Sequence, residues 1–406
     1  MEHPADPQVR FLARLGAAMG AANYPVTLIR QMLDRASAAY GTSHEVVALP
    51  NSVQVTGPAP GGTATAAAHQ DAELRFDQMF PLARLVSAAM RGAVSPTDGN
   101  DRLDRILARP APYPPWLTVL GYGVWSTGLG LVLEPSPLNL LGAAALGLIV
   151  GVLAVAGQRF GQLGPLVPVT AAFVVATVSI AVVEHLELDH VGLRALIPPL
   201  AMFLPGAAIT LAVIELTARD IVSGSARLMA GFVQLAQLAF GILIAAQLLG
   251  EDESRLSAEP LNKLGSWAPW LGVAVYALGV MLFFAPPRSF LPWLLAVCYA
   301  AFTAQFLGDL ALGSYASGFA GGLVLTGCAL MLSRRPGAPP AITMILPGFW
   351  LLVPGSMGLI GFAELFGADG DSALGVTFIS MISVALGLQA GLVLWQLLRR
   401  ARRRAG

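Results

Sequence analysis

The stretch that decides the fold runs from Ile197 to Ser223 and reads IPPLAMFLPGAAITLAVIELTARDIVS. It returns without a gap as LPGFWLLVPGSMGLIGFAELFGADGDS, from Leu346 to Ser372. The register pairs Pro205-Gly206 with Pro354-Gly355, Glu215 with Glu364, Asp220 with Asp369 and Ser223 with Ser372. Matches between apolar residues are common in membrane segments, but a shared Pro-Gly pair, glutamate, aspartate and serine are not. We interpret the two stretches as an internal duplication.

The composition is that of an integral membrane protein. Hydrophobic residues make up 55% of the chain and charged residues 12%, with a mean hydropathy of +0.68. A soluble globular protein carries roughly 25% charged residues. Cys298 and Cys328 lie in apolar runs without metal-ligand spacing, so we expect no disulfide framework, no metal and no other cofactor. We also expect no nucleic-acid partner.

Residues 1–115 are predicted to form a small cytoplasmic α+β domain that ends in a Pro-rich linker. Apolar spacing indicates two helices, then strands near residues 45–49, 52–56 and 63–67, then two more helices. Charged residues interrupt the first apolar positions, so no signal peptide is expected. The domain contains no nucleotide-binding loop, nucleophile elbow or metalloprotease motif, and we therefore expect no enzyme.

Ten apolar runs follow, each long enough to cross a hydrocarbon core of about 30 Å. They are residues 116–133, 138–157, 165–183, 194–216, 226–250, 267–285, 290–307, 313–332, 342–365 and 372–398. Arginines occupy alternate loops and acidic residues occupy the others, with Arg194, Arg255 and Lys263 as exceptions. This alternation predicts ten transmembrane helices with both termini in the cytoplasm.

The duplication gives the membrane domain an internal order. It predicts a five-helix repeat at 116–250, an extracytoplasmic loop at 251–266, a second repeat at 267–398 and a basic cytoplasmic tail at 399–406. An odd number of spans inverts the second copy relative to the first. Inverted repeats are typical of secondary transporters, which bind their substrate near the membrane midplane.

The Pro-Gly pairs predict a break in the middle of two spans. Proline inside a helix removes a hydrogen bond and costs about 3 kcal/mol or more, and irregular backbone at membrane depth is tolerated only inside protein or beside water. The half-helix after each break would offer free N–H groups to a carboxylate, while the freed carbonyls would suit an ammonium group. The candidate substrate-binding residues are Pro205, Gly206, Ala207, Thr210, Pro354, Gly355 and Ser356. The alternative is a pair of packing kinks without a ligand.

Glu215 and Glu364 are candidates for proton coupling or gating, because acidic residues near membrane depth are rare and usually functional. At about 1.5 Å per residue, Glu215 lies roughly 13 Å beyond the break. A solvated helix end is therefore the competing interpretation.

Several motifs resemble the threonine/serine exporter family. They are RLGAAMGAANYPVTLIRQMLDRASAAYG, LPNSVQVTG, LDRILARPAPYPPWL, IPPLAMFLPGAAITLAVIELTARDIVSGSARL and LVPGSMGLIGFAEL, and together they extend over nearly the whole chain. The resemblance implies export of small hydroxylated amino acids such as threonine and serine, driven by the proton motive force, across the cytoplasmic membrane of a bacterium. Relatives whose two halves are separate proteins are linked to dicarboxylate export, so a small dicarboxylate such as succinate is the alternative substrate.

Two other hypotheses concern the cytoplasmic domain. It could be a hydrolase that feeds the pore, or a regulatory or oligomerisation domain of a homo-oligomer. The partners expected from the sequence are a small amino acid or organic acid, protons and the lipid bilayer.

Overall fold

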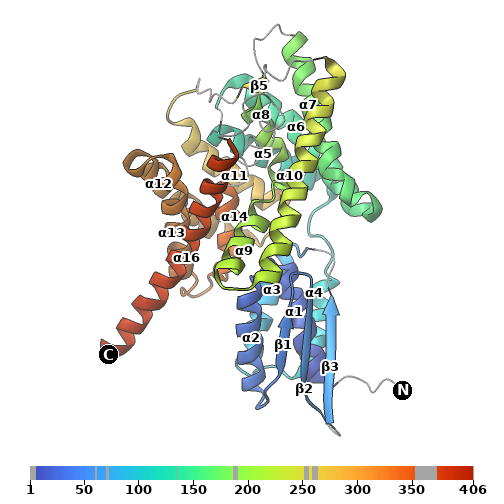
Figure 1. Cartoon of the computed structure of the whole chain (residues 1–406), viewed down its shortest axis with the longest axis vertical. Coiled ribbons are helices and arrows are strands. Elements are labelled where there is room, and N and C mark those ends of the chain that lie inside the picture. The colour runs from blue at the N-terminus through green and yellow to red at the C-terminus, as the bar shows by residue number, and fades with distance from the viewer. Residues whose placement is uncertain are drawn as a thin grey trace. The chain divides into compact units, whose positions relative to one another are not determined.

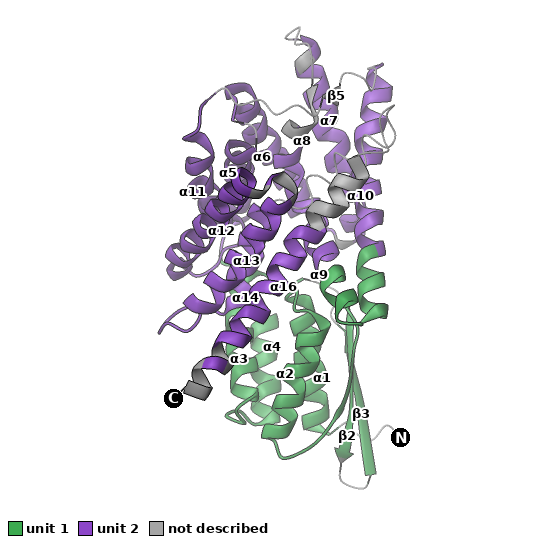
Figure 2. Ribbon diagram, turned by 60° about the vertical axis from the view of Figure 1, so that its left-hand side comes forward, with its two compact units in different colours: residues 1–112, 211–228 green, residues 113–210, 229–406 purple. Residues whose placement is uncertain are grey.

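A computed structural model describes residues 6–59, 62–69, 73–133, 135–185, 191–250, 256–257, 264–352 and 373–405. The chain divides into two compact units (Figure 2). Unit 1 comprises residues 1–112 and 211–228, and unit 2 comprises residues 113–210 and 229–406. A short segment that the sequence assigns to the membrane domain thus packs with the N-terminal residues.

The N-terminal part of unit 1 has the predicted α+β fold. Its elements are α1 (Pro7–Ala21), α2 (Val26–Ala39), β1 (Glu45–Ala48), β2 (Ser52–Ala59), β3 (Gly62–His69), α3 (Phe76–Ala89) and α4 (Pro96–Leu107). The strands form an antiparallel sheet in the order β1-β2-β3, and the helices lie on one face of it (Figures 1 and 2).

The central strand predicted at residues 52–56 is present, and its side chains alternate between the two faces of the sheet. Val53 and Val55 are buried beneath α1, while Gln54 between them is exposed. Gly16 lets α1 approach this strand, because a Cβ there would lie 2.9 Å from Val53 Cγ1. Ser95 accepts a hydrogen bond from the Asp98 N–H at 3.1 Å and so caps α4.

The described residues of the rest of the chain are almost entirely helical. Its elements are α5 (Pro115–Leu133), α6 (Pro137–Arg159), η1 (Gly161–Leu166), α7 (Val167–His185), β4 (Val191–Gly192), α8 (Leu193–Leu200), η2 (Ala201–Phe203), α9 (Gly206–Thr217), α10 (Ile221–Leu249), β5 (Leu256–Ser257), α11 (Ala268–Phe283), η4 (Arg288–Phe290), α12 (Leu291–Leu312), α13 (Ser314–Leu332), α14 (Ala341–Leu351) and α16 (Ala373–Ala405). Strands β4 and β5, which the sequence did not predict, pair in parallel.

Helix occupies each of the ten predicted runs within the residues that the structure describes. Five helices there are long and apolar enough to cross a membrane, and a bent pair made by α8 and α9 gives a sixth candidate. The other apolar helices are shorter: Ala268–Phe283, Ala316–Leu332, Ala341–Leu351 and Ile382–Leu398. The chain is a multi-pass membrane protein.

Helices α5 and α11 cross in unit 2 with their backbones in close approach. A Cβ at Gly128 would lie 2.3 Å from the Tyr276 nitrogen, and a Cβ at Gly279 would lie 2.3 Å from the Trp125 Cα. Only glycine fits at such a crossing, as in other tightly packed membrane helices. Tyr122, Trp125 and Tyr276 are fully or almost fully buried around it.

Two tyrosines connect this crossing to helices that contain proline. The Tyr122 hydroxyl of α5 donates to the Pro199 carbonyl of α8 at 2.7 Å. The Tyr276 hydroxyl of α11 donates to the Pro347 carbonyl of α14 at 2.6 Å. Proline has no backbone N–H to donate, but its carbonyl can still accept a hydrogen bond. Each tyrosine hydroxyl donates to one such carbonyl.

Candidate functional site

The fourth predicted run is broken at the predicted position. Helix α8 passes into the single turn η2, Leu204 is extended with φ −70° and ψ 125°, and α9 begins at Gly206. The two halves are bent by 53°. Pro205 causes the break, because its ring excludes helical backbone at the preceding residue and its nitrogen has no hydrogen to donate.

The carbonyls on the α8 side of the break are partly satisfied by protein. The Gln234 side-chain amide of α10 donates to the Phe203 carbonyl at 2.8 Å, and Tyr122 occupies the Pro199 carbonyl. These two carbonyls are thus already engaged by side chains, which weakens the sequence-based expectation that freed carbonyls hold an ammonium group.

The α9 side of the break is polar and incompletely paired. The first backbone bond of this helix is from the Ile209 N–H to the Pro205 carbonyl at 2.9 Å, so the N–H groups of its first turn point beyond the helix without an intrahelical acceptor. Thr210, one turn along α9, is 2% exposed, and its hydroxyl has no hydrogen-bond partner among the described residues. Gly206 is buried and Ala207 half-buried.

Further along α9, in unit 1, Glu215 is 0% exposed. Its Oε1 accepts a hydrogen bond from the Val26 N–H, the first residue of α2, at 3.1 Å. Arg227 of α10 donates from Nε to the two carboxylate oxygens at 3.2 and 3.1 Å. The carboxylate therefore caps α2 and pairs with an arginine, and the interpretation of Glu215 as a solvated helix end is wrong because α2 covers it.

A second ion pair lies next to this contact. Arg30 of α2 binds both carboxylate oxygens of Asp220, in the turn between α9 and α10. The Arg227 charge also acts on Glu73, just before α3. Glu73 as a whole is exposed, but desolvation of its carboxyl group raises the Glu73 pKa. The positive charge of Arg227 opposes that rise. Nη2 of Arg227 is buried without a hydrogen-bond partner in the described part of the chain.

We name this cluster of Val26, Arg30, Glu215, Asp220 and Arg227 the α2–α9 latch. The sequence indicated Glu215 alone, and assigned Arg227 only to the positive charge of an inside loop. The missed signal was an acidic and a basic residue facing each other across the short turn between two apolar helices. Val26 and Arg30 were not predictable, because they come from a different domain of the sequence.

The second copy of the predicted site lies outside the described residues. Pro354, Gly355, Ser356 and Glu364 all fall within residues 353–372, and α14 ends before them at Leu351. Among the residues that are described, no group of three or more His, Cys, Asp or Glu side chains has the arrangement of a metal site.

Comparison with known proteins gives a family match over residues 10–249, to the family described as "Putative threonine/serine exporter". Proteins named "Pheromone-regulated membrane protein 10" are similar over much of the chain. The one from Eremothecium gossypii is 24% identical over 329 residues, which are 74% of this chain and 43% of the relative. The one from Kluyveromyces lactis is 25% identical over 324 residues, 74% of this chain and 34% of the relative.

A further relative of the same name, from Saccharomyces cerevisiae strain S288c, is 25% identical over 319 residues, which are 73% of this chain and 82% of the relative. The chain thus spans less than half of the length of the first two fungal relatives. No solved structure matches it.

Proposed function

Because the chain belongs to the threonine/serine exporter family, whose match covers residues 10–249, we propose that it is a secondary transporter that exports threonine and serine from the cytoplasm. The observation that carries the proposed site is the break between α8 and α9. There the first turn of α9 has no intrahelical acceptor for its N–H groups, and the Thr210 hydroxyl is buried without a partner among the described residues. A free helix N-terminus attracts a carboxylate, and a buried hydroxyl without a partner is ready to bond a polar substrate.

We assign substrate binding in the first copy to Pro205, Gly206, Ala207 and Thr210. The proline and glycine open the helix, the Ala207 N–H lies in its free first turn, and the Thr210 hydroxyl provides a side-chain contact. Pro354, Gly355 and Ser356 take the same role in the second copy by the duplication in the sequence.

The proposed architecture is ten spans in two inverted five-helix repeats, in a bacterial cytoplasmic membrane with both termini in the cytoplasm. Two paired features of unit 2 support it. At the crossing of α5 and α11, a glycine of each helix lies against the backbone of the other helix. A tyrosine from each helix also donates to a proline carbonyl, in α8 and in α14. These pairs connect corresponding parts of the two sequence copies.

Export is proposed to be driven by the proton motive force, with Glu215 in a gating role. Its support is the latch, in which the Glu215 carboxylate joins α9 to the first turn of α2. Helix α9 begins at the proposed substrate site, and Glu215 near its other end accepts a hydrogen bond from α2. Substrate binding at the start of the helix can therefore act on this contact. Glu364 is the proposed counterpart in the second copy.

Counterflow of labelled threonine in proteoliposomes tests the function. We expect saturable exchange that depends on a proton gradient and is competed by serine. Competition by succinate instead of serine would select the dicarboxylate alternative. Absence of exchange with all three compounds would contradict transport, and turnover of a peptide or amide by the full chain would favour a hydrolase.

Thr210→Val is expected to separate substrate binding from stability. Valine keeps the shape of threonine and removes a buried hydroxyl that has no partner among the residues described by the structure. The free energy of unfolding should therefore rise by about 1 kcal/mol or more, and the protein should melt at a higher temperature. The lost hydrogen bond to substrate should weaken threonine binding by about tenfold. Thermal melting and counterflow affinity measure the two effects.

Thr326→Val is the matched control for this variant. Thr326 of α13 is 3% exposed, and its hydroxyl likewise has no partner among the described residues. We expect it to stabilise the protein similarly and to leave threonine affinity unchanged. If Thr210→Val and Thr326→Val had equal affinities for threonine, Thr210 would not be a substrate-binding residue.

A further inference from the structure

A pocket of about 400 Å³ lies between α3 and α4, in the N-terminal part of unit 1. It is lined by Pro81, Arg84, Leu85, Arg102, Arg105, Ile106 and Arg109. Four of these seven residues are arginines, and the other three are apolar. The spacing explains the arrangement. Arg102, Arg105 and Ile106 follow one face of α4, Arg109 lies just beyond the end of that helix, and Pro81, Arg84 and Leu85 follow one face of α3.

The positive charge of this arginine pocket is poorly compensated. Arg84 and Arg102 have no ion pair or hydrogen bond within the described residues. Arg105 donates from Nε to the Asp101 carbonyl at 3.3 Å, which is a neutral acceptor. Of the four arginines, Arg109 is the one that pairs with a carboxylate of the described residues, with its Nε 3.6 Å from Asp77.

A neighbouring acid on α4 is engaged elsewhere. Asp104 pairs with Arg14 of α1, and the hydrogen bond from that guanidinium holds the Asp104 pKa below its usual value. Its negative charge is therefore used by α1 and does not compensate the adjacent Arg105.

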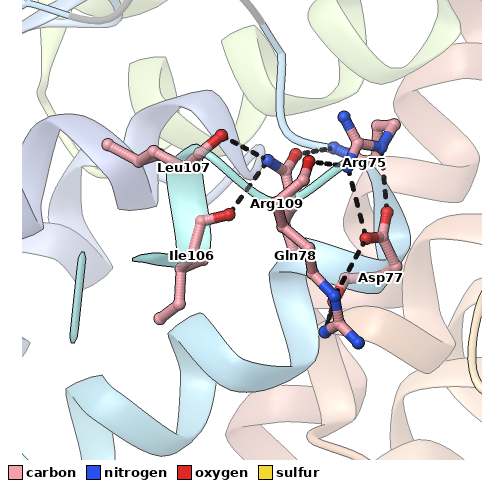
Figure 3. Close-up of polar contacts among 6 residues, drawn as sticks. All are labelled: Arg75, Asp77, Gln78, Ile106, Leu107 and Arg109. Carbon is pink, nitrogen blue, oxygen red and sulfur yellow. Dashed lines mark hydrogen bonds and ion pairs between the residues drawn. The ribbon is translucent and has the colours of Figure 1, made fainter. Parts of the chain in front are cut away.

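Hydrogen bonds fix the two walls of the pocket relative to each other (Figure 3). The Gln78 side-chain amide donates to the Ile106 and Leu107 carbonyls at 3.1 and 3.0 Å, which satisfies carbonyls at the end of α4. Arg75 donates to the Arg109 carbonyl at 2.7 Å and pairs with buried Asp77. The helices that carry the arginines are thus held in place before any ligand arrives.

We propose that the arginine pocket binds a phosphate-bearing anion. Guanidinium groups present a planar fork of donors that matches phosphate oxygens, and several of them facing one space recognise phosphate strongly. The apolar residues Pro81, Leu85 and Ile106 accommodate an organic part beside the phosphate, and the volume is in the range of small-molecule sites. The phosphate comes from a soluble metabolite or from an anionic lipid headgroup, since only the linker from Pro110 to Pro114 separates Arg109 from α5 in the chain.

Hydrogen exchange of the full chain in nanodiscs tests the proposal in two arms. In the first, nanodiscs of phosphatidylcholine alone are titrated with inorganic pyrophosphate. In the second, nanodiscs contain phosphatidylglycerol and the buffer contains no phosphate. We expect the amides of α3 and α4 to gain protection in at least one arm. Protection in the first arm alone identifies a soluble phosphate compound as the ligand. Protection in the second arm alone identifies a lipid headgroup, and protection in both arms means that the pocket recognises the phosphate group common to the two.

Four variants make the test specific. Arg102→Gln combined with Arg105→Gln should weaken binding by about tenfold or more, and Arg84→Gln alone should weaken it less. Arg102→Lys combined with Arg105→Lys should retain part of it, because charge remains and the fork is lost. Arg35→Gln, at an exposed arginine on α2, should have no effect. No protection in either arm, or an equal loss in the Arg35 variant, would overturn the proposal.

Discussion

Arg227→Met is expected to destabilise the α2–α9 latch by about 3–5 kcal/mol, the usual cost of removing one partner of a buried ion pair. The Arg227 and Glu215 side chains are 12% and 0% exposed. Without the guanidinium, the Glu215 carboxylate would keep the Val26 N–H as its one partner among the described residues. It would then be buried with no ion-pair partner in that part of the chain. The first turn of α2 should then separate from α9.

Hydrogen exchange at the start of α2 measures this directly, because the Val26 amide is itself the donor to Glu215. We expect its protection to fall in Arg227→Met and to recover in Arg227→Met combined with Glu215→Gln, since two neutral groups no longer leave a charge unpaired. Arg30→Met is the control. The Arg30 side chain is 42% exposed, and such pairs contribute up to about 1 kcal/mol. If the Val26 amide were as poorly protected in the double variant as in Arg227→Met, the assignment of Arg227 as the counter-charge of Glu215 would be contradicted.

The same contacts decide what Glu215 is expected to do in transport. A carboxylate that must release a proton to each side needs water on both, whereas Glu215 is enclosed by α2 and Arg227. A gate needs contacts that break together. The Glu215 carboxylate provides such contacts, because it joins α9 to both α2 and α10. We therefore expect transport by Glu215→Gln to change in rate while its proton dependence remains.

The sequence was sufficient where short-range patterns determine the structure. Alternation of Val53 and Val55 located the central strand, and proline chemistry located the break at Pro205. The patterns could not predict the latch, because Val26 and Glu215 are 189 residues apart in the chain. Hydropathy assigned residues 211–228 to the membrane domain, and only their packing showed that they belong to unit 1.

The arginine pocket illustrates a different limit. Its arginines are visible in the sequence, but so are Asp98, Asp101 and Asp104 among them, and a helix with mixed charges is normally a solvated surface. The structure separates the charges, because Asp104 turns to Arg14 while the arginines line the space facing α3. Charge on one helix became informative only when the neighbouring helices were placed.

Gly128→Ala and Gly279→Ala are each expected to destabilise the membrane domain by about 3 kcal/mol or more, the upper range for overpacking. The added Cβ atoms would lie 2.3 Å from backbone atoms of Tyr276 and Trp125, and backbone cannot move aside as a side chain does. The α5–α11 crossing must then open. Thermal melting in detergent, followed by size-exclusion chromatography, measures the loss of folded protein.

Gly142→Ala and Gly327→Ala are the matched controls, because a Cβ at either helical position would meet nothing within 4 Å. They should be neutral or stabilising by up to about 1 kcal/mol, the usual gain in replacing a helical glycine. Combining Gly128→Ala with Gly279→Ala should cost less than the two single effects together, since one substitution already separates the helices that the other would push apart. Unchanged melting in both single variants would mean that α5 and α11 do not pack through these glycines, and the proposed pairing of the two repeats would lose its contact.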